Sequence, residues 1–486
     1  MLFSSISYFI FFPIVFALYW IAPLRARRAL LLVASYVFYM SWIPAYGLLI
    51  MLLTVLNYFI GWSLESFRKH SKVLLVFGLI VNLGTLCFFK YTNFLLANLS
   101  DLLRAVAPWM PFSFDASSIQ QVNIILPLGI SFFAFEFIHY ICDVYKGSKA
   151  IRSPIDFALF AAFFPSQIAG PIKRYQDFIE QLPNEAKFDP QLCNQGIVLL
   201  LQGLFKKIAL SDNLALLANQ GFNSANTALA TSDAWIAAMA FTFQIYFDFS
   251  GYTDMGRGSA LMLGYKLPDN FNFPYLATSM SDFWKRWHIS LSTWLRDYLY
   301  VPLGGGRCSP LRKYYNLMVT MLLGGLWHGA AWHFVAWGGL HGGLLIVNHK
   351  YSDFVERRPW LQHAHAHPVG KVLSITLTFM MVLVSWVFFR AETVTHALSM
   401  LKSMFLEFEA SSAVLSMSTI APLCVALSVY SIYALLNRMH DNSSFVFLRP
   451  RLSLTIPARA ALYLGVAFAA VGLAPSAPSP FIYFQF

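Results

Sequence analysis

Residues 372–389 have the sequence Val-Leu-Ser-Ile-Thr-Leu-Thr-Phe-Met-Met-Val-Leu-Val-Ser-Trp-Val-Phe-Phe and contain no charged side chain. A helix that crosses a bilayer needs about 20 mostly apolar residues, so this run predicts a membrane-spanning helix. Comparable apolar runs recur along the chain, at Ser5–Ile21, Ala29–Trp42, Leu48–Ser63, Val73–Phe89, Val122–Ile141, Phe157–Ala169, Gln195–Leu210, Trp235–Phe249, Tyr315–Leu326, Ala331–Val347, Ile420–Leu436 and Ala461–Ala474. Several are too short to span upright. We therefore expect an all-α polytopic membrane protein with about eleven transmembrane helices plus re-entrant or interfacial helices.

The composition agrees with a lipid environment. Of the 486 residues, 58% are hydrophobic and 12% are charged, which is about half the charged share of a soluble protein. The formal net charge is +11, but the basic residues form short clusters between apolar runs. This pattern is typical of loops that face anionic lipid and argues against nucleic acid as a partner. The five cysteines are scattered, so neither a disulfide framework nor a zinc cluster is expected.

The basic clusters also predict an orientation. They follow the first, third and fifth apolar runs and comprise Arg25, Arg27, Arg28, Arg68, Lys69, Lys72, Lys146, Lys149 and Arg152. Basic loops stay in the cytoplasm, so the N-terminus is expected on the outer face of the membrane. No internal repeat and no soluble domain is visible. We expect one membrane-embedded domain over residues 1–486, with core motifs in 120–350 and divergent helices in 370–486.

Two acidic residues stand in an otherwise apolar stretch. The sequence from Gln244 is Gln-Ile-Tyr-Phe-Asp-Phe-Ser-Gly-Tyr-Thr-Asp-Met-Gly-Arg-Gly, which includes Asp248, Ser250, Asp254 and Arg257. Ionisable groups at membrane depth are costly, so they face a partner or a cavity. Two interpretations stay open here: a structural Asp–Arg pair that joins two helices, or acids that line a substrate path.

A second polar segment follows at 279–298. Ser281 is placed to cap a helix, and Trp284, His288, Leu291 and Leu295 recur at helical spacing. The segment predicts an amphipathic helix at the cytoplasmic interface, with His288 on its apolar face. A lone histidine in such a place is more often a hydrogen-bonded core residue than a functional one.

The densest motif is Leu323-Gly-Gly-Leu-Trp-His-Gly-Ala-Ala-Trp-His-Phe-Val-Ala-Trp-Gly-Gly-Leu-His-Gly342. Small residues flank His328 and let a backbone or a ligand approach closely. An imidazole accepts and releases protons near neutral pH, so His328 is a candidate catalytic group. Packing or an interfacial hydrogen bond is the favoured role for His333 and His341. The histidine spacing, without a nearby carboxylate ligand, does not predict a metal site.

One further pair is a structural candidate. Glu136 and His139 lie three residues apart in an apolar run. On a helix they would share a face, where they could hydrogen-bond to each other.

Taken together, these segments resemble the membrane-bound O-acyltransferase family. The resemblance is carried by Phe163-Phe-Pro-Ser-Gln-Ile-Ala-Gly-Pro-Ile172, Asp282-Phe-Trp-Lys-Arg-Trp-His288 and Trp327-His-Gly-Ala330. It is closest to the branch that includes the membrane subunit of alginate O-acetylation and the D-alanine transferase of teichoic acids. The resemblance implies a ring of helices around a central tunnel, with the hallmark histidine at His328 and a second functional position at His288. The candidate tunnel residues are Asp248, Ser250, Asp254, Trp284, Trp327 and His341.

The resemblance also implies an activity. The chain would sit in a bacterial cytoplasmic (inner) membrane and move an acetyl group from acetyl-CoA toward a cell-surface or exopolysaccharide hydroxyl of the alginate, cellulose or peptidoglycan type. His328 would act as general base, and His288 would orient the donor or assist proton transfer. No permanently bound cofactor is implied, and a separate extracytoplasmic acetyltransferase is an expected partner. Transfer of another acyl group, such as D-alanyl, to teichoic acid or lipid, and a non-enzymatic transporter or flippase, are the alternatives.

Overall fold

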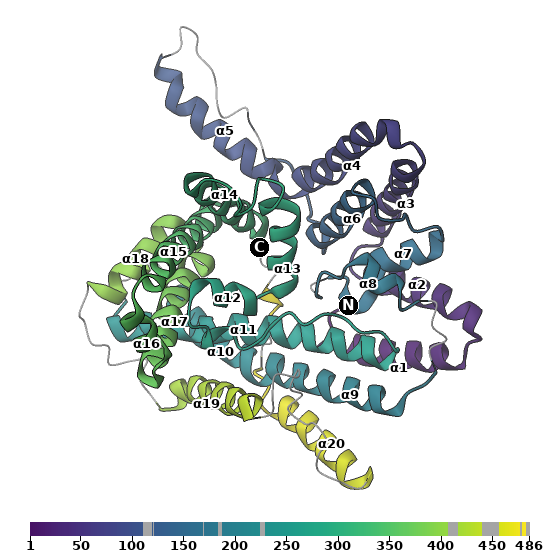
Figure 1. The fold of residues 1–486 in the computed structure, drawn as a ribbon. Coiled ribbons are helices and arrows are strands. Elements are labelled where there is room, and N and C mark those ends of the chain that lie inside the picture. Colours follow the sequence, from purple (N-terminus) through teal and green to yellow (C-terminus); the bar gives the residue numbers. More distant parts are fainter. Residues whose placement is uncertain are drawn as a thin grey trace.

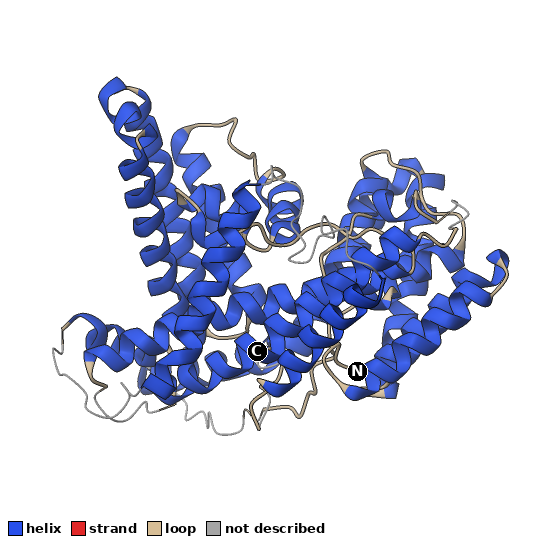
Figure 2. Ribbon diagram, turned by 90° about the horizontal axis from the view of Figure 1, so that it is seen from below, coloured by secondary structure: helices blue, strands red, loops and turns tan. Residues whose placement is uncertain are grey.

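The computed structural model describes residues 1–109, 119, 121–168, 170–182, 187–223, 229–406, 417–439, 456–476 and 479–482. Within these ranges every regular element is a helix, as Figure 2 shows. The main helices are α1 (Ile6–Ile21), α2 (Leu24–Met40), α3 (Pro44–Ser66), α4 (Ser71–Leu86), η2 (Cys87–Tyr91), α5 (Thr92–Val106), α6 (Ile130–Tyr145), α7 (Pro154–Ala162), α8 (Tyr175–Ile179), α9 (Pro190–Phe205), η6 (Lys206–Ser211), α10 (Asp212–Phe222), α11 (Thr231–Met262), α12 (Met280–Arg286), α13 (Ile289–Leu295), η8 (Arg296–Tyr300), α14 (Pro310–His328), α15 (Trp332–Glu356), α16 (Pro359–Ala366), α17 (Pro368–Arg390), α18 (Val394–Phe405), α19 (Met417–Met439) and α20 (Ile456–Gly472). The all-α prediction is confirmed for the part of the chain that the structure describes.

The helices differ in how well they match a membrane span. In the described ranges, three are long and apolar enough to cross a bilayer: Pro44–Ser66, Arg68–Trp109 and Pro368–Arg390. Shorter apolar helices cover Ile6–Ile21, Pro154–Ser166, Ile420–Leu435 and Ala460–Gly472. The count of about eleven spans stays a prediction.

Two predicted runs have wrong boundaries. The run Val122–Ile141 is not one helix, because α6 begins only at Ile130 and the preceding residues have no regular secondary structure. Gly129 interrupts it with a φ of 71°, and a Cβ at this position would lie 3.0 Å from the carbonyl oxygen of Gln167. In contrast, α11 continues well past the predicted Trp235–Phe249, through Asp254 and Ser259, which bond to Lys206 of η6 and Tyr8 of α1.

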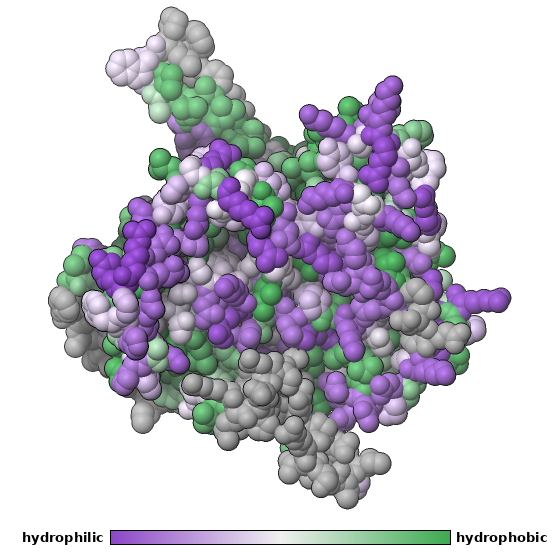
Figure 3. All heavy atoms as spheres, in the orientation of Figure 1, coloured by the Kyte–Doolittle hydropathy of each residue, from purple (hydrophilic) through white to green (hydrophobic). Residues whose placement is uncertain are grey.

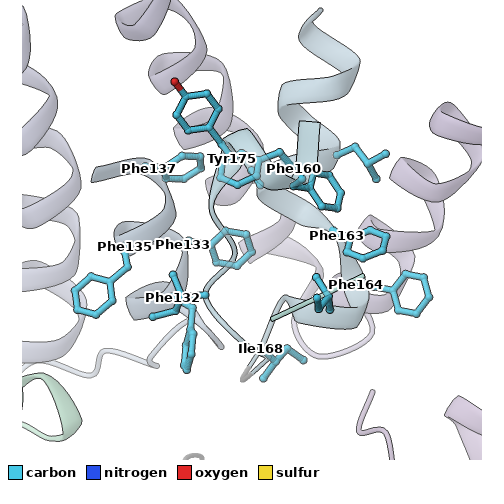
Figure 4. Close-up of a cluster of buried hydrophobic side chains, with 14 of the residues drawn as sticks. Phe132, Phe133, Phe135, Phe137, Phe160, Phe163, Phe164, Ile168 and Tyr175 are labelled. Carbon is cyan, nitrogen blue, oxygen red and sulfur yellow. The ribbon is translucent and has the colours of Figure 1, made fainter. Parts of the chain in front are cut away.

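Much of the core is aromatic. Figure 4 shows one buried cluster, in which Phe133 and Phe137 of α6 lie beside Phe160 and Phe163 of the neighbouring segment. Phe164 belongs to the same cluster, and its backbone N–H donates to the Ser35 hydroxyl of α2 at 3.1 Å. The cluster thereby packs α2, α6 and α7 together on one side of the molecule.

On the other side, α9 and α11 pack through glycines. A Cβ on Gly203 would lie 2.4 Å from the carbonyl oxygen of Gly251, and a Cβ on Gly196 would lie 2.6 Å from that of Gly258. A Cβ on Gly251 would lie 2.7 Å from the carbonyl oxygen of Gly203, and a Cβ on Gly258 would lie 2.5 Å from that of Gly196. Neither member of either pair therefore has room for a side chain. Small residues at such crossings let two helix backbones touch, which is a main source of stability between membrane helices. The two glycine pairs therefore fix how α11 lies against α9.

Gly203→Ala should reduce the free energy of unfolding by about 1–3 kcal/mol, because the new methyl group overlaps a backbone oxygen. The matched control is Gly84→Ala in α4, where no atom lies within 4 Å of the added Cβ. That control should be neutral or stabilising by up to about 1 kcal/mol, since alanine favours a helix. Thermal midpoints in detergent measure both, and equal midpoints for the two variants would contradict the glycine packing.

Candidate functional site

His328 is the last residue of α14. The chain leaves the helix at Gly329 and starts α15 at Trp332. A Cβ on Gly329 would lie 2.0 Å from the ring of Phe334, and a Cβ on Gly325 would lie 2.2 Å from the carbonyl oxygen of Phe334. The glycines of this motif are thus required for the tight packing of α14 on α15 beside His328.

The His328 side chain is buried, with 4% of its surface exposed. Its ring centroid lies 5.0 Å from Trp327, 5.1 Å from Trp337 and 5.2 Å from Phe389. His328 also lines a pocket of about 140 Å³. The other residues around this pocket include Trp42, Lys90, Ser131, Phe132 and Trp327. An imidazole therefore borders a small pocket with aliphatic and aromatic walls and one cationic side chain in its lining.

His288 lies between two short helices and not on one face of a single helix. The predicted continuous amphipathic helix is wrong, because α12 ends at Arg286 and α13 begins at Ile289. His288 itself has a φ of 42°, a left-handed conformation that costs a non-glycine residue about 1–3 kcal/mol. The predicted cap is also shifted, since Ser279 and not Ser281 accepts the hydrogen bond from the Asp282 N–H.

Asn270 holds this strained turn. Its side-chain oxygen accepts hydrogen bonds from the Ser290 N–H at 3.1 Å and from the Ser290 hydroxyl at 2.8 Å. The same oxygen lies 3.2 Å from Nδ1 of His288. An amide oxygen carries no hydrogen and can only accept, so Nδ1 of His288 carries the proton and the lone pair of the ring is on Nε2. Asn270 thus fixes both the orientation and the tautomer of His288.

Trp327 lies between the two histidines. Its ring centroid is 6.2 Å from that of His288 and 5.0 Å from that of His328. The indole is fixed by a stack, in which Phe135 lies 5.1 Å from Trp327 and 3.8 Å from Trp294. The structure therefore brings His288, Trp327 and His328 into one buried cluster.

A larger cavity of about 590 Å³ lies next to this cluster. It is bounded by α9, α11, α19 and the segment 266–273, and its lining includes Ser250 and Asp254 from the predicted tunnel residues. Asn270 and Ile289, which flank His288 in space and in sequence, line it as well. The cavity therefore reaches the backbone and the asparagine that hold His288.

Charged side chains line this large cavity in pairs. Asp254 accepts from Lys206 of η6 at 2.7 Å and from Gln202 of α9 at 3.0 Å. Arg257 lies 3.9 Å from Asp254 and forms a closer ion pair of 2.5 Å with Asp269. Asp254 thus joins α11 to η6 through Lys206, and not through the expected Asp–Arg pair, and it also lines a cavity. That this cavity is a substrate path stays a prediction.

Asp248 has a different environment and lines neither cavity. It pairs with Lys207 at 2.8 Å, and Lys207 also pairs with Asp212 at 2.7 Å. Each of the three side chains is 5% exposed or less.

This buried cluster anchors residues 479–482, the yellow segment near the centre of Figure 1. The Ile482 N–H donates to Asp248 at 2.7 Å, and Lys207 donates to the Ser479 carbonyl at 2.9 Å. Phe481 stacks on Tyr252 of α11 at 4.3 Å. A segment distant in sequence is thereby tied into the helix that also carries Ser250 and Asp254.

Trp284 and His341 form a neighbouring group around Trp337. The Trp337 ring lies 5.9 Å from Trp284, 4.6 Å from His341 and 5.1 Å from His328. Nε2 of His341 lies 2.9 Å from the Ser385 hydroxyl. Neither Trp284 nor His341 lines either of the two cavities. The ring of Trp337 separates both of them from His328.

Two other predictions concern polar clusters. Glu136 does not pair with His139, because it accepts from Lys173 at 2.6 Å, while Nδ1 of His139 lies 3.2 Å from the Phe135 carbonyl. Among the described residues, no group of three or more His, Cys, Asp or Glu side chains is placed to hold a metal ion.

The two cavities come close to α2 at different levels. The N-terminal amine donates to the Ser41 hydroxyl at 2.5 Å, so α1 and α2 run antiparallel. Trp20, just before the start of α2, donates to the carbonyl of Met262, and the neighbouring Leu261 lines the large cavity. Trp42, just past the end of α2, lines the small pocket. A helix of 17 residues is about 25 Å long, so one part of the large cavity and one wall of the small pocket lie near opposite ends of α2.

Lys90, Asn270, Lys206 and Lys207 were not singled out by the sequence. Lys90 carried a signal, because it is the only charged residue between Lys72 and Asp101 and intramembrane charges mark functional sites. The partners of the other residues are far apart in sequence, and no local pattern predicts them.

Lys207→Met should destabilise the protein by about 3–5 kcal/mol, because it leaves Asp212 and Asp248 buried near each other without a cation. Replacing both acids as well, in Lys207→Met/Asp212→Asn/Asp248→Asn, removes the uncompensated charge and should recover most of the thermal midpoint. A triple variant no more stable than the single one would contradict this account of the cluster.

The comparisons with known proteins agree with this architecture. A family model described as the membrane-bound O-acyltransferase family matches residues 73–389. The "Probable alginate O-acetylase AlgI" of Azotobacter vinelandii is 38% identical over 99% of this chain and 99% of its own length. The protein of the same name from Pseudomonas aeruginosa is 42% identical over 83% of this chain and 74% of its own length. The "Peptidoglycan O-acetyltransferase" of Helicobacter pylori is 36% identical over 82% of this chain and 78% of its own length.

The match with the family model covers more than half of the chain, and these relatives align with most of it. The chain therefore belongs to the membrane-bound O-acyltransferase family.

Proposed function

We propose that this membrane O-acyltransferase moves an acetyl group from a cytoplasmic thioester, acetyl-CoA, toward a polysaccharide hydroxyl on the other side of the membrane. The observation that carries the proposal is the buried cluster of His288, Trp327 and His328: Trp327 and His328 line the small pocket, and Asn270, the partner of His288, lines the large cavity. The named relatives that act on alginate and on peptidoglycan support acetyl as the transferred group and a cell-surface glycan as the acceptor.

The large cavity suits the donor. Its lining contains three cations, Lys206, Arg257 and Lys266, against the two acids Asp254 and Asp269, and this excess of positive charge attracts an anionic donor. Arg25, Arg27 and Arg28 lie at the start of α2, near the end of α11 where Leu261 lines this cavity. Under the positive-inside rule that end faces the cytoplasm, which puts the N-terminus outside. A thioester made in the cytoplasm would then enter where the basic residues are.

The small pocket suits the acceptor side. His328 borders it together with aromatic walls, and its volume of about 140 Å³ suits a single group and not a whole carrier. An extracytoplasmic partner protein that takes the acetyl group onward is consistent with this size. A continuous tunnel between the two cavities, within one domain over residues 1–486 and a bacterial inner membrane, is part of the proposal.

The chemistry needs one base and one oriented thioester. His328 takes the proton of the acceptor hydroxyl while the hydroxyl oxygen attacks the thioester carbonyl. The C–S bond breaks, the C–O ester bond forms, and the proton passes from His328 to the leaving sulfur. His288, with its lone pair on Nε2 and its ring fixed by Asn270, orients the donor on the other side of Trp327. Holding both reactants in one buried site supplies much of the rate.

His328→Ala should lower acetyl transfer by about 10²–10⁴-fold, because the general base is removed. The matched control is His333→Gln. His333 lies five residues further along and is also buried, but its Nδ1 contacts the Phe388 carbonyl at 3.0 Å. The control should keep near-normal activity. The measurement is ester-linked acetate on the cell surface at matched membrane expression, and unchanged acetate in the His328→Ala strain would refute the proposal.

The transporter alternative is tested on the purified protein. With labelled acetyl-CoA in detergent, an acyltransferase transfers the label to an acceptor or releases it slowly as free acetate, and His328→Ala stops both. A transporter leaves the thioester intact in both proteins.

A further inference from the structure

A lysine from a distant helix caps the end of α14. Nζ of Lys90 donates to the carbonyl oxygens of Trp327 at 2.5 Å and of His328 at 3.0 Å. The hydroxyl of the next residue, Tyr91, donates to the carbonyl of Leu326 at 2.9 Å. The last three carbonyl groups of α14 are thus bonded by two consecutive side chains more than two hundred residues away in sequence.

The local helix geometry makes this possible. Lys90 and Tyr91 belong to η2, a π-helical turn of residues 87–91 inserted between α4 and α5. A π-helical turn holds one more residue than an α-helical turn, which rotates the following side chains, and such turns occur often at functional sites. In Figure 1, α5 leaves the body of the molecule directly after this turn, and Figure 3 shows an apolar surface along the part of it that is coloured. The π turn therefore points Lys90 inward while the helix continues outward.

The end of α14 needs such a cap. The last four carbonyls of any helix have no partner inside the helix, and together they form the negative end of its dipole. At membrane depth no bulk water is present to satisfy them. An ammonium group is a fitting partner, because it carries a positive charge and three N–H donors. Two of these donors are used on the carbonyls, and Lys90 also lines the pocket that His328 borders.

We propose that Lys90 is a positioning residue of the acyl-transfer site. By bonding the carbonyls of Trp327 and His328, it holds the last turn of α14 so that the His328 imidazole stays against the pocket. The inference rests on the proposed function of His328. Lys90 acts through the backbone of His328 and not on the proton itself, so its loss affects the rate of the chemical step more than donor binding in the separate large cavity.

The test compares Lys90→Met, Lys90→Gln and Lys90→Arg with wild type and with His328→Ala, in the purified full-length protein with labelled acetyl-CoA. Lys90→Met should lower kcat about 10²-fold, the size of effect that a 1 Å misplacement produces, with KM for the donor within threefold. Lys90→Arg keeps the charge and the donors and should recover activity to within about tenfold of wild type. The control is Lys72→Met. Lys72 is an exposed lysine near the start of α4, the helix that leads into η2, and this variant should have wild-type kinetics.

Each outcome bears on the proposal. Equal kcat values for Lys90→Met and wild type overturn it, and so does a loss confined to KM. If Lys90→Met does not fold, as judged by gel filtration in detergent, Lys90→Arg and Lys90→Gln decide. The proposal requires at least tenfold more activity for Arg than for Gln, and equal activity overturns it. If His328→Ala is fully active, the proposed function fails first, and the two failures are thereby distinguished.

Discussion

The site depends on how α14 ends. A helix that stops inside a membrane protein leaves carbonyl groups without partners, and each unsatisfied group is costly where water is excluded. Here α14 ends at His328, and the side chains of Lys90 and Tyr91 donate hydrogen bonds to the last three carbonyl groups of the helix. Glycines let α15 pack tightly against the same turn. An imidazole, a pocket and a half-buried cation are therefore brought together by the requirements of one helix terminus.

The other side of the site is organised by buried ions. Asp248 and Asp254 of α11 pair with Lys207 and Lys206, two consecutive residues of the π-helical segment η6. Removing one partner of a buried ion pair leaves an uncompensated charge, and this costs more than replacing both partners by apolar residues. Such pairs therefore hold α11 against its neighbours. The two pairs have different consequences. Asp254 borders the large cavity, whereas Asp248 ties residues 479–482 into the core.

The sequence predicted the helices better than the site. Apolar runs such as Val372–Phe389 identify helices because lipid demands continuous apolar surface. Such runs do not predict where a helix begins or ends when one residue with a positive φ sets the boundary. Gly129 moves the start of α6 to Ile130, and His288 divides one expected helix into α12 and α13. His288, Trp327 and His328 could be named as candidates from the motif, but the roles of Lys90 and Asn270 could not. Their partners lie in distant parts of the chain, and only the packed structure brings them together.

The central claim of the proposed function is that the large cavity is reached from one face of the membrane and the small pocket from the other. It can be tested by single cysteines placed in a background in which Cys87, Cys142, Cys193, Cys308 and Cys424 are replaced by serine. Lys266→Cys reports on the large cavity and Trp42→Cys on the small pocket, and both positions are exposed. With a membrane-impermeant maleimide, Trp42→Cys should react in spheroplasts, and Lys266→Cys should react only in inverted vesicles. Reaction of both cysteines from the same side would contradict the account.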